Sequence, residues 1–193
     1  MKLPTSLILA SLVVSTLSGC APVMIGGAAA TADALHSRRT VGTIVDDEAI
    51  ELKATIALHE NKDIYNQTHI SVVSYNGVVL MVGQAPTEAL RQHAESIVKG
   101  IEKVRLVHDE VIIAAPNSLI TRSSDSLITA KVKAALFHVD IEGFDPTRVK
   151  VVTEDGVVYL MGMVYRNEAD AVVAQARQVG GVEKIVKLFE YQD

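Results

Sequence analysis

Cysteine and aromatic residues are scarce in this chain. Cys20 is the only cysteine among 193 residues, so no disulfide can form within one chain. Tryptophan is absent and aromatic residues make up 4% of the sequence, so the hydrophobic cores are predicted to be mostly aliphatic. Basic residues are outnumbered by acidic ones, which gives a formal net charge of −5. Such a balance argues against a general nucleic-acid-binding protein.

Catalytic and metal-binding motifs are missing as well. The histidines include no His-x-x-x-His pair and have no cysteine partner, so no metal site and no cofactor are predicted. Both conspicuous glycine pairs belong to hairpins and not to a nucleotide-binding loop. Ser123 and Ser124 lack the setting of a nucleophile elbow. We therefore expect a protein that is not an enzyme. The scattered histidines are His36, His59, His69, His93, His108 and His138.

The first twenty residues are typical of an exported protein. Lys2 precedes an apolar run over residues 7–17 that is too short to cross a bilayer. The run ends in Leu-Ser-Gly-Cys, which resembles the lipobox of bacterial lipoproteins. The resemblance implies that residues 1–19 are a signal peptide, that Cys20 carries acyl chains such as palmitate, and that residues 20–42 form a lipidated tether. Ala21, where an aspartate would signal retention, implies export to the outer membrane. The alternative is an ordinary signal peptide followed by an incidental thiol.

Two hairpins with the same pattern organise the rest of the chain. Residues 69–85 and 148–164 each contain β-branched runs around a turn dipeptide, Asn76-Gly77 or Asp155-Gly156. These dipeptides favour the positive φ of a tight two-residue turn. A second glycine follows six residues later, Gly83 or Gly162, where we expect a bulge or the close approach of a helix. The offset of 79 between the glycine pairs indicates a duplicated unit.

Each unit is predicted to have the order helix, strand, strand, helix, strand. In the first, Asp46-Asp47-Glu48 is expected to begin a helix that ends near His59, and Pro86-Thr87-Glu88 to begin the second helix. In the second, the first helix is expected to begin at Asp125, and residues 184–191 form the last strand. The predicted fold class is α+β, with each three-stranded mixed sheet packed on two helices. The domains are expected over residues 43–114 and 119–193, joined by a short linker.

This unit resembles the BON domain, through its Gly-Val-Val-x-(Leu/Met)-x-Gly hairpin and its Gly-(Ile/Val)-x-x-(Val/Ile) ending. Two such units behind a lipobox resemble the dual-BON outer-membrane lipoproteins of Gram-negative bacteria (the DolP type). Residues 39–47 and 79–86 are similar to the corresponding segments of their first domain. The resemblance implies a periplasm-facing, lipid-anchored protein that supports outer-membrane integrity. It also implies binding of anionic phospholipid, such as phosphatidylglycerol or cardiolipin, through the second domain.

The first helix of the second domain is the candidate membrane contact. Leu127 and Phe137 lie about 100° and 180° from the core-facing Ile128 at the helical repeat of about 100° per residue. Lys131 and Lys133 flank this surface. Exposed apolar residues beside lysines suit an interfacial membrane contact. The alternative is structural, with Leu127 against the linker between the domains and Phe137 closing the core.

The first domain suggests a different role. Its first helix carries Ala49, Leu52 and Ile56 off the core-facing stripe, which predicts burial against the other domain or contact with a protein partner. A protein-interaction adaptor for the outer-membrane protein assembly machinery is therefore the alternative function. Arg38 and Arg39 add positive charge near the anchor, either touching anionic headgroups or lying in an ordinary solvated linker.

Overall fold

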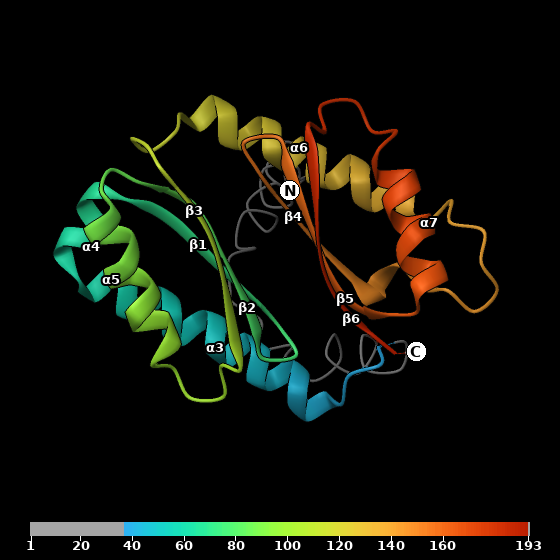
Figure 1. Ribbon diagram of the computed structural model, residues 1–193, viewed down its shortest axis with the longest axis horizontal. Coiled ribbons are helices and arrows are strands. Elements are labelled where there is room, and N and C mark those ends of the chain that lie inside the picture. Colours follow the sequence, from blue (N-terminus) through green and yellow to red (C-terminus); the bar gives the residue numbers. More distant parts are fainter. Residues whose placement is uncertain (1–36, 193) are drawn as a thin grey trace, which may run out of the picture.

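The computed structural model describes residues 37–192, which form two domains of the same design (Figure 1). The first domain contains α3 (Val41–Glu60), α4 (Lys62–Gln67), β1 (His69–Tyr75), β2 (Val78–Ala85), α5 (Glu88–Lys99) and β3 (Leu106–Ile113). The second contains α6 (Leu119–Leu136), the 3-10 turn η1 (Pro146–Arg148), β4 (Val149–Glu154), β5 (Val157–Val164), α7 (Arg166–Ala176) and β6 (Lys184–Tyr191). The predicted order of elements is confirmed, with α4 and η1 as additions.

Each domain has a three-stranded mixed sheet with its most apolar and most deeply buried strand in the middle. β2 pairs antiparallel with β1 and parallel with β3, and β5 pairs in the same way with β4 and β6. The parallel pairing follows from the helical crossover, α5 or α7, between the second and third strands. The α+β prediction is therefore confirmed.

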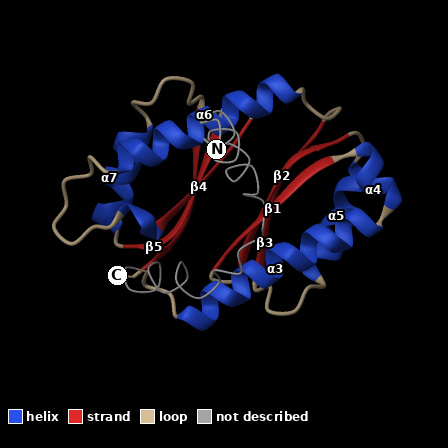
Figure 2. Cartoon of the chain, turned by 180° about the vertical axis from the view of Figure 1, so that it is seen from behind, coloured by secondary structure: helices blue, strands red, loops and turns tan. Residues whose placement is uncertain are grey.

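The two sheets face each other, and the helices cover their outer faces (Figures 1 and 2). Alternate residues of β2 serve different cores: Val79 and Met81 face the helices of their own domain, whereas Leu80 and Val82 face the other sheet. Tyr159 and Met161 of β5 meet them from the second domain. Burial raises the pKa of the Tyr159 hydroxyl to about 12. The result is a four-layer arrangement in which both central strands are buried on both faces.

The hairpin turns have the left-handed backbone that their dipeptides predict. Asn76 and Gly77 have φ of 53° and 72°, and Asp155 and Gly156 have φ of 47° and 72°. The later glycine permits a close approach of backbone to backbone, and the expected helix is not involved. A Cβ on Gly83 would lie 1.9 Å from the His69 carbonyl oxygen, in a residue whose φ is +120°.

The first helix of each domain begins earlier than predicted. Thr40 caps α3 and Ser118 caps α6, through side chains that accept from the amides of Thr43 and Thr121. Asp47 and Asp125 consequently lie inside their helices, buried, and do not cap them. The sequence prediction of capping aspartates is therefore wrong.

These two aspartates bind the hairpin turns instead. The Asp47 carboxylate accepts hydrogen bonds from the amides of Asn76 (2.7 Å) and Gly77 (2.8 Å) and from the Ser74 hydroxyl (2.7 Å). Asp125 accepts from the amides of Asp155 and Gly156, both at 3.0 Å. A buried carboxylate needs such donors, because desolvation without them is costly. Each domain thus ties its first helix to its hairpin.

Candidate functional site

The segment before α3 connects the two domains. The Arg38 guanidinium binds both Glu168 carboxylate oxygens, at 2.6 and 2.8 Å, and donates to the Met163 carbonyl at 3.0 Å. Burial on its own raises the pKa of Glu168, but hydrogen bonds from Arg38 and the Tyr165 amide outweigh it and hold that pKa below its ordinary value.

Arg39 binds residues of the first domain. It pairs with Asp47 at 2.8 Å and lies over the Tyr75 ring, 3.9 Å from its centroid. The Tyr75 hydroxyl in turn donates to the Arg148 carbonyl of the second domain at 3.1 Å. The expectation that these arginines touch headgroups or lie in a solvated linker is therefore wrong. They hold the chain to the junction of the domains.

The outer face of α6 exposes apolar side chains beside a lysine. We define the α6 outer face as Ile120, Leu127, Lys131 and Ala134, which recur at helical spacing on one flank of the helix, about 60–120° around it from the buried Ile128. Ile120 is 81% exposed and Leu127 is 63% exposed. Leu127 therefore does not pack against the linker. Among the described residues, Lys131 has no hydrogen-bond or ion-pair partner.

The structure separates the four predicted contact residues into two pairs. Leu127 and Lys131 lie one turn apart on the α6 outer face. Lys133 and Phe137, also one turn apart, are at the C-terminal end of the helix and line a cavity between the domains. Phe137 is 72% exposed and does not close the core. The cavity is thus a separate environment beside the outer face.

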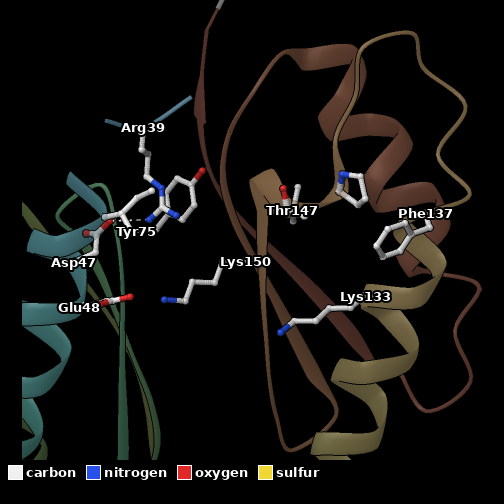
Figure 3. A pocket seen from close by; sticks show the side chains of 11 residues that line it. Arg39, Asp47, Glu48, Tyr75, Lys133, Phe137, Thr147 and Lys150 are labelled. Carbon is white, nitrogen blue, oxygen red and sulfur yellow. Dashed lines mark hydrogen bonds and ion pairs between the residues drawn. The ribbon is translucent and has the colours of Figure 1, made fainter. Parts of the chain in front are cut away.

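This interdomain cavity has a volume of about 400 Å³. Both domains contribute to it: Arg39, Ile44, Asp47, Glu48 and Tyr75 from the first, and Lys133, Phe137, Pro146, Thr147, Val149 and Lys150 from the second. Figure 3 shows Glu48 on the side of the first domain and Lys133 and Phe137 on the side of the second. The volume is within the range of small-molecule sites.

The charges around the cavity differ in how they are paired. Arg39 and Asp47 neutralise each other, and the Lys150 ammonium is 2.6 Å from Glu51 and 3.2 Å from the Ser74 carbonyl. Within residues 37–192, Glu48 and Lys133 have neither hydrogen bond nor ion pair. One carboxylate and one ammonium are therefore available to a ligand, from opposite domains.

The first helix of the first domain, α3, also exposes apolar side chains, but its charged residues are mostly acidic where those of α6 are mostly basic. Val41, Val45, Leu52 and Ile56 are about half exposed or more, on the side away from the core residues Ile50 and Ala54. The predicted burial of Leu52 and Ile56 against the second domain is wrong, because the domains meet through their sheets. The helix carries one lysine against five carboxylates, and that lysine, Lys53, lies 3.7 Å from Glu102.

Sequence reasoning missed Ile120 and the cavity residues Glu48 and Lys150. Ile120 was missed because the helix was expected to begin at Asp125, although its spacing of seven from Leu127 repeats the helical pattern. The cavity draws on several distant segments, so no local pattern indicates it.

Two structural findings bear on function within the described residues. No helix there has both the length and the apolar composition needed to cross a membrane. No cluster of three or more histidine, cysteine or acidic side chains is placed there to hold a metal ion. Cys20, the predicted acylation site, lies outside the described residues.

Comparison with known proteins supports the division into two units. The model of the BON domain matches residues 46–115 and 124–193. Outer membrane lipoprotein DolP of Haemophilus influenzae is 37% identical over 178 residues, which cover 92% of this chain and 91% of the relative. This similarity supports the predicted lipid-anchored location at the outer membrane, with the domains in the periplasm.

Two further relatives cover most of the chain. The 21 kDa hemolysin of Actinobacillus pleuropneumoniae is 36% identical over 154 residues, 79% of this chain and 78% of its own length. Osmotically-inducible protein Y of Escherichia coli is 35% identical over 153 residues, 77% of this chain and 74% of its own length. All three similarities are long enough to reach into both domains.

Proposed function

Because this chain belongs to the BON-domain family, as a dual-BON protein of the DolP type, we propose that it is a non-enzymatic membrane-binding lipoprotein. The acylated Cys20 anchors it, and the second domain binds anionic phospholipid at the periplasmic side of the outer membrane. Its role is to support the integrity of that membrane.

One observation carries the proposal: α6 exposes Ile120 and Leu127 together with Lys131, a lysine that pairs with none of the residues that the structure describes. Leucine and isoleucine side chains favour the acyl boundary, and each gains roughly 1.5–3 kcal/mol when fully buried. A lysine near an anionic surface adds about 1 kcal/mol. Lys133 and Phe137 extend the contact at the end of the helix.

The anchor makes a modest contact sufficient. A lipid chain confines the domains near the bilayer, so the second binding event is governed by a high effective concentration. The contact of α6 then orients the domains more than it recruits them. Arg38 supports this role, because its bond to Glu168 fixes the segment that follows the tether against the second domain.

Vesicle flotation tests the proposal without the anchor. The mature polypeptide, residues 20–193 with Cys20→Ala, is mixed with vesicles containing phosphatidylglycerol or cardiolipin, and with phosphatidylcholine vesicles as reference. We expect flotation with the anionic vesicles only. No flotation with either anionic lipid overturns the proposal.

A pair of substitutions locates the contact. Leu127→Glu is expected to abolish flotation and to leave the melting temperature unchanged, because Leu127 is exposed. Leu52→Glu is the matched control, since Leu52 is 62% exposed on the equivalent helix. Equal loss in the two variants contradicts a contact through α6.

A second function is favoured by α3. Its exposed apolar residues Val45, Leu52 and Ile56 lie among carboxylates, which an anionic bilayer repels and a protein partner with positive charge does not. We propose that this surface binds a protein, the outer-membrane protein assembly machinery being the candidate. Crosslinking from position 52, with position 127 as control, tests it; a crosslinked pattern identical at the two positions contradicts it.

A further inference from the structure

We propose that the interdomain cavity binds the headgroup of a single phospholipid, with its phosphodiester at Lys133 and Lys150 and a headgroup hydroxyl or ammonium at Glu48. This proposal rests on the proposed function, which brings the cavity to a bilayer surface. It adds a site that both domains form and that binds one lipid per protein molecule, beside the less specific membrane contact of the α6 outer face.

The charges of the cavity call for a ligand that carries both an anion and a donor. Lys133 has no partner among the described residues, and Lys150 shares its ammonium with Glu51, so both favour a phosphate. Glu48 repels a simple anion, but it accepts a hydrogen bond from a donor a few atoms away from that anion. Phosphoglycerol and phosphoethanolamine headgroups each have this arrangement.

The apolar part of the lining calls for an amphiphile. Ile44 and Val149 are buried in the wall of the cavity, while Phe137 is largely exposed at its edge (Figure 3). A cavity of about 400 Å³ holds a headgroup and part of the glycerol backbone, but not two acyl chains. The chains therefore leave the cavity beside Phe137, toward the bilayer that the α6 outer face contacts.

The test uses lipids short enough to stay monomeric in solution. The mature polypeptide with Cys20→Ala is titrated with dihexanoyl phosphatidylglycerol or dihexanoyl phosphatidylethanolamine, below their micelle concentrations, and amide shifts are followed by NMR. We expect saturable shifts at Thr147, Val149 and Lys150 with at least one lipid. Shifts that do not saturate, or that fall only on the α6 outer face, overturn the proposal.

A matched pair of lysines separates the cavity from general surface charge. Lys133→Ala is expected to raise Kd for the soluble lipid about tenfold, the loss of one charge-assisted hydrogen bond. Lys184→Ala removes the same charge at the start of β6, away from the residues that line the cavity, and is expected to change this Kd by less than about twofold. Both lysines are exposed, so neither change should unfold the domain. Equal losses in the two variants overturn the proposal.

A third variant distinguishes the two headgroups. For an ammonium, Glu48→Gln replaces an ion pair with a hydrogen bond to an uncharged amide oxygen. For a hydroxyl, the same change only exchanges a charged acceptor for a weaker, uncharged one. If phosphoethanolamine is the ligand, its Kd rises about tenfold in this variant; if phosphoglycerol is, its Kd rises less. No change in Kd for either lipid removes Glu48 from the site and overturns the assignment.

The flotation result keeps this proposal separate from the proposed function. Flotation without saturable binding of soluble lipid means that the membrane contact exists and the cavity site does not. Saturable binding of soluble lipid without flotation means that the cavity site exists and the membrane contact does not.

Discussion

The helices α3 and α6 occupy equivalent places in two copies of one fold, yet they present opposite surfaces. Each covers the outer face of its sheet and holds a buried aspartate against the hairpin turn. Over its whole length, the buried aspartate included, α3 carries one lysine against five carboxylates, whereas α6 carries three basic residues against one carboxylate. Duplication has kept what the fold needs and has left the outer side free to diverge.

The difference teaches which residues belong to stability and which to binding. The hairpin glycines recur at an offset of 79 and the buried helix aspartates that bind the turns recur at an offset of 78, because the backbone of the turn requires both. The exposed apolar residues do not recur in the same way: Leu127 corresponds to Ala49, and Leu52 to Ala130. Of the two lysines, Lys131 corresponds to Lys53, but Lys133 corresponds to Thr55.

The largest expected effect is in the shared scaffold. Gly83→Ala should destabilise the protein by about 4 kcal/mol, because the backbone is left-handed there and the new Cβ would lie 1.9 Å from the His69 carbonyl oxygen. Gly162→Ala should cost less, about 2 kcal/mol, since its contact with the Arg148 oxygen is 2.6 Å and its φ is not left-handed. Urea unfolding measures both. Gly180→Ala, which meets nothing within 4 Å, is the control; equal costs at Gly83 and Gly162 would contradict the account.

Replacing the buried aspartate should also destabilise the first domain more than the second. Asp47→Ala leaves the donors of Ser74, Asn76 and Gly77 without their acceptor, at a cost of about 3 kcal/mol. Asp125→Ala strands two amides and should cost about 2 kcal/mol. Thermal or urea unfolding gives the values.

The neighbouring Asp46 provides the control for this comparison. It is partly exposed and pairs only with an exposed lysine, so Asp46→Ala should cost less than about 1 kcal/mol. A cost at Asp46 equal to that at Asp47 would show that helix charge, and not the turn, is what matters.

The smallest expected effect concerns Glu154, which lies beside the second hairpin turn where the first domain has Tyr75. Burial raises the pKa of the Glu154 carboxyl, and the neighbouring Asp155 and Asp125 add to the shift. A raised folded-state pKa means that the protonated form is favoured in the fold, so stability is lost as pH rises through that value. Glu154→Gln keeps an acceptor for Gln84 and Asn117, and should stabilise the protein by less than about 1 kcal/mol at pH 7.

The pH dependence makes this prediction specific. The gain of Glu154→Gln should shrink as the pH falls to about 4, near the ordinary pKa of glutamate, because the native carboxyl is then protonated as well. Melting temperatures across that range measure it. A gain that stays constant with pH would mean that the charge of Glu154 costs the fold nothing.

The elements of the fold follow from local patterns in the sequence. The hairpins rest on Asn76-Gly77 and Asp155-Gly156, and the strand over residues 184–191 has the predicted bounds. The contact between the sheets was not predicted, although Val78, Leu80 and Val82 gave a signal. These residues are apolar on the face that an exposed sheet would make polar, which indicates a strand buried on both faces.

The candidate site was only partly predictable for a physical reason. Helical periodicity identifies Leu127 as off the core from α6 alone, because exposure on one helix is a local property. Whether Lys133 lies with Lys131 or across from it at a cavity depends on where the first domain packs. That placement is set by contacts such as Arg38 with Glu168, which are 130 residues apart.

One charge reversal at equivalent positions tests the central claim, that α6 and not α3 meets the membrane. Lys131 and Lys53 are related by the offset of 78 between the helices, and both are exposed. In flotation with phosphatidylglycerol vesicles, Lys131→Glu should weaken binding about thirtyfold, because the loss of one attraction and the gain of one repulsion each cost about 1 kcal/mol. Lys53→Glu should leave binding within about twofold of the parent. Equal weakening by both variants, or a stronger effect at Lys53, would contradict the assignment of the membrane-binding surface to α6.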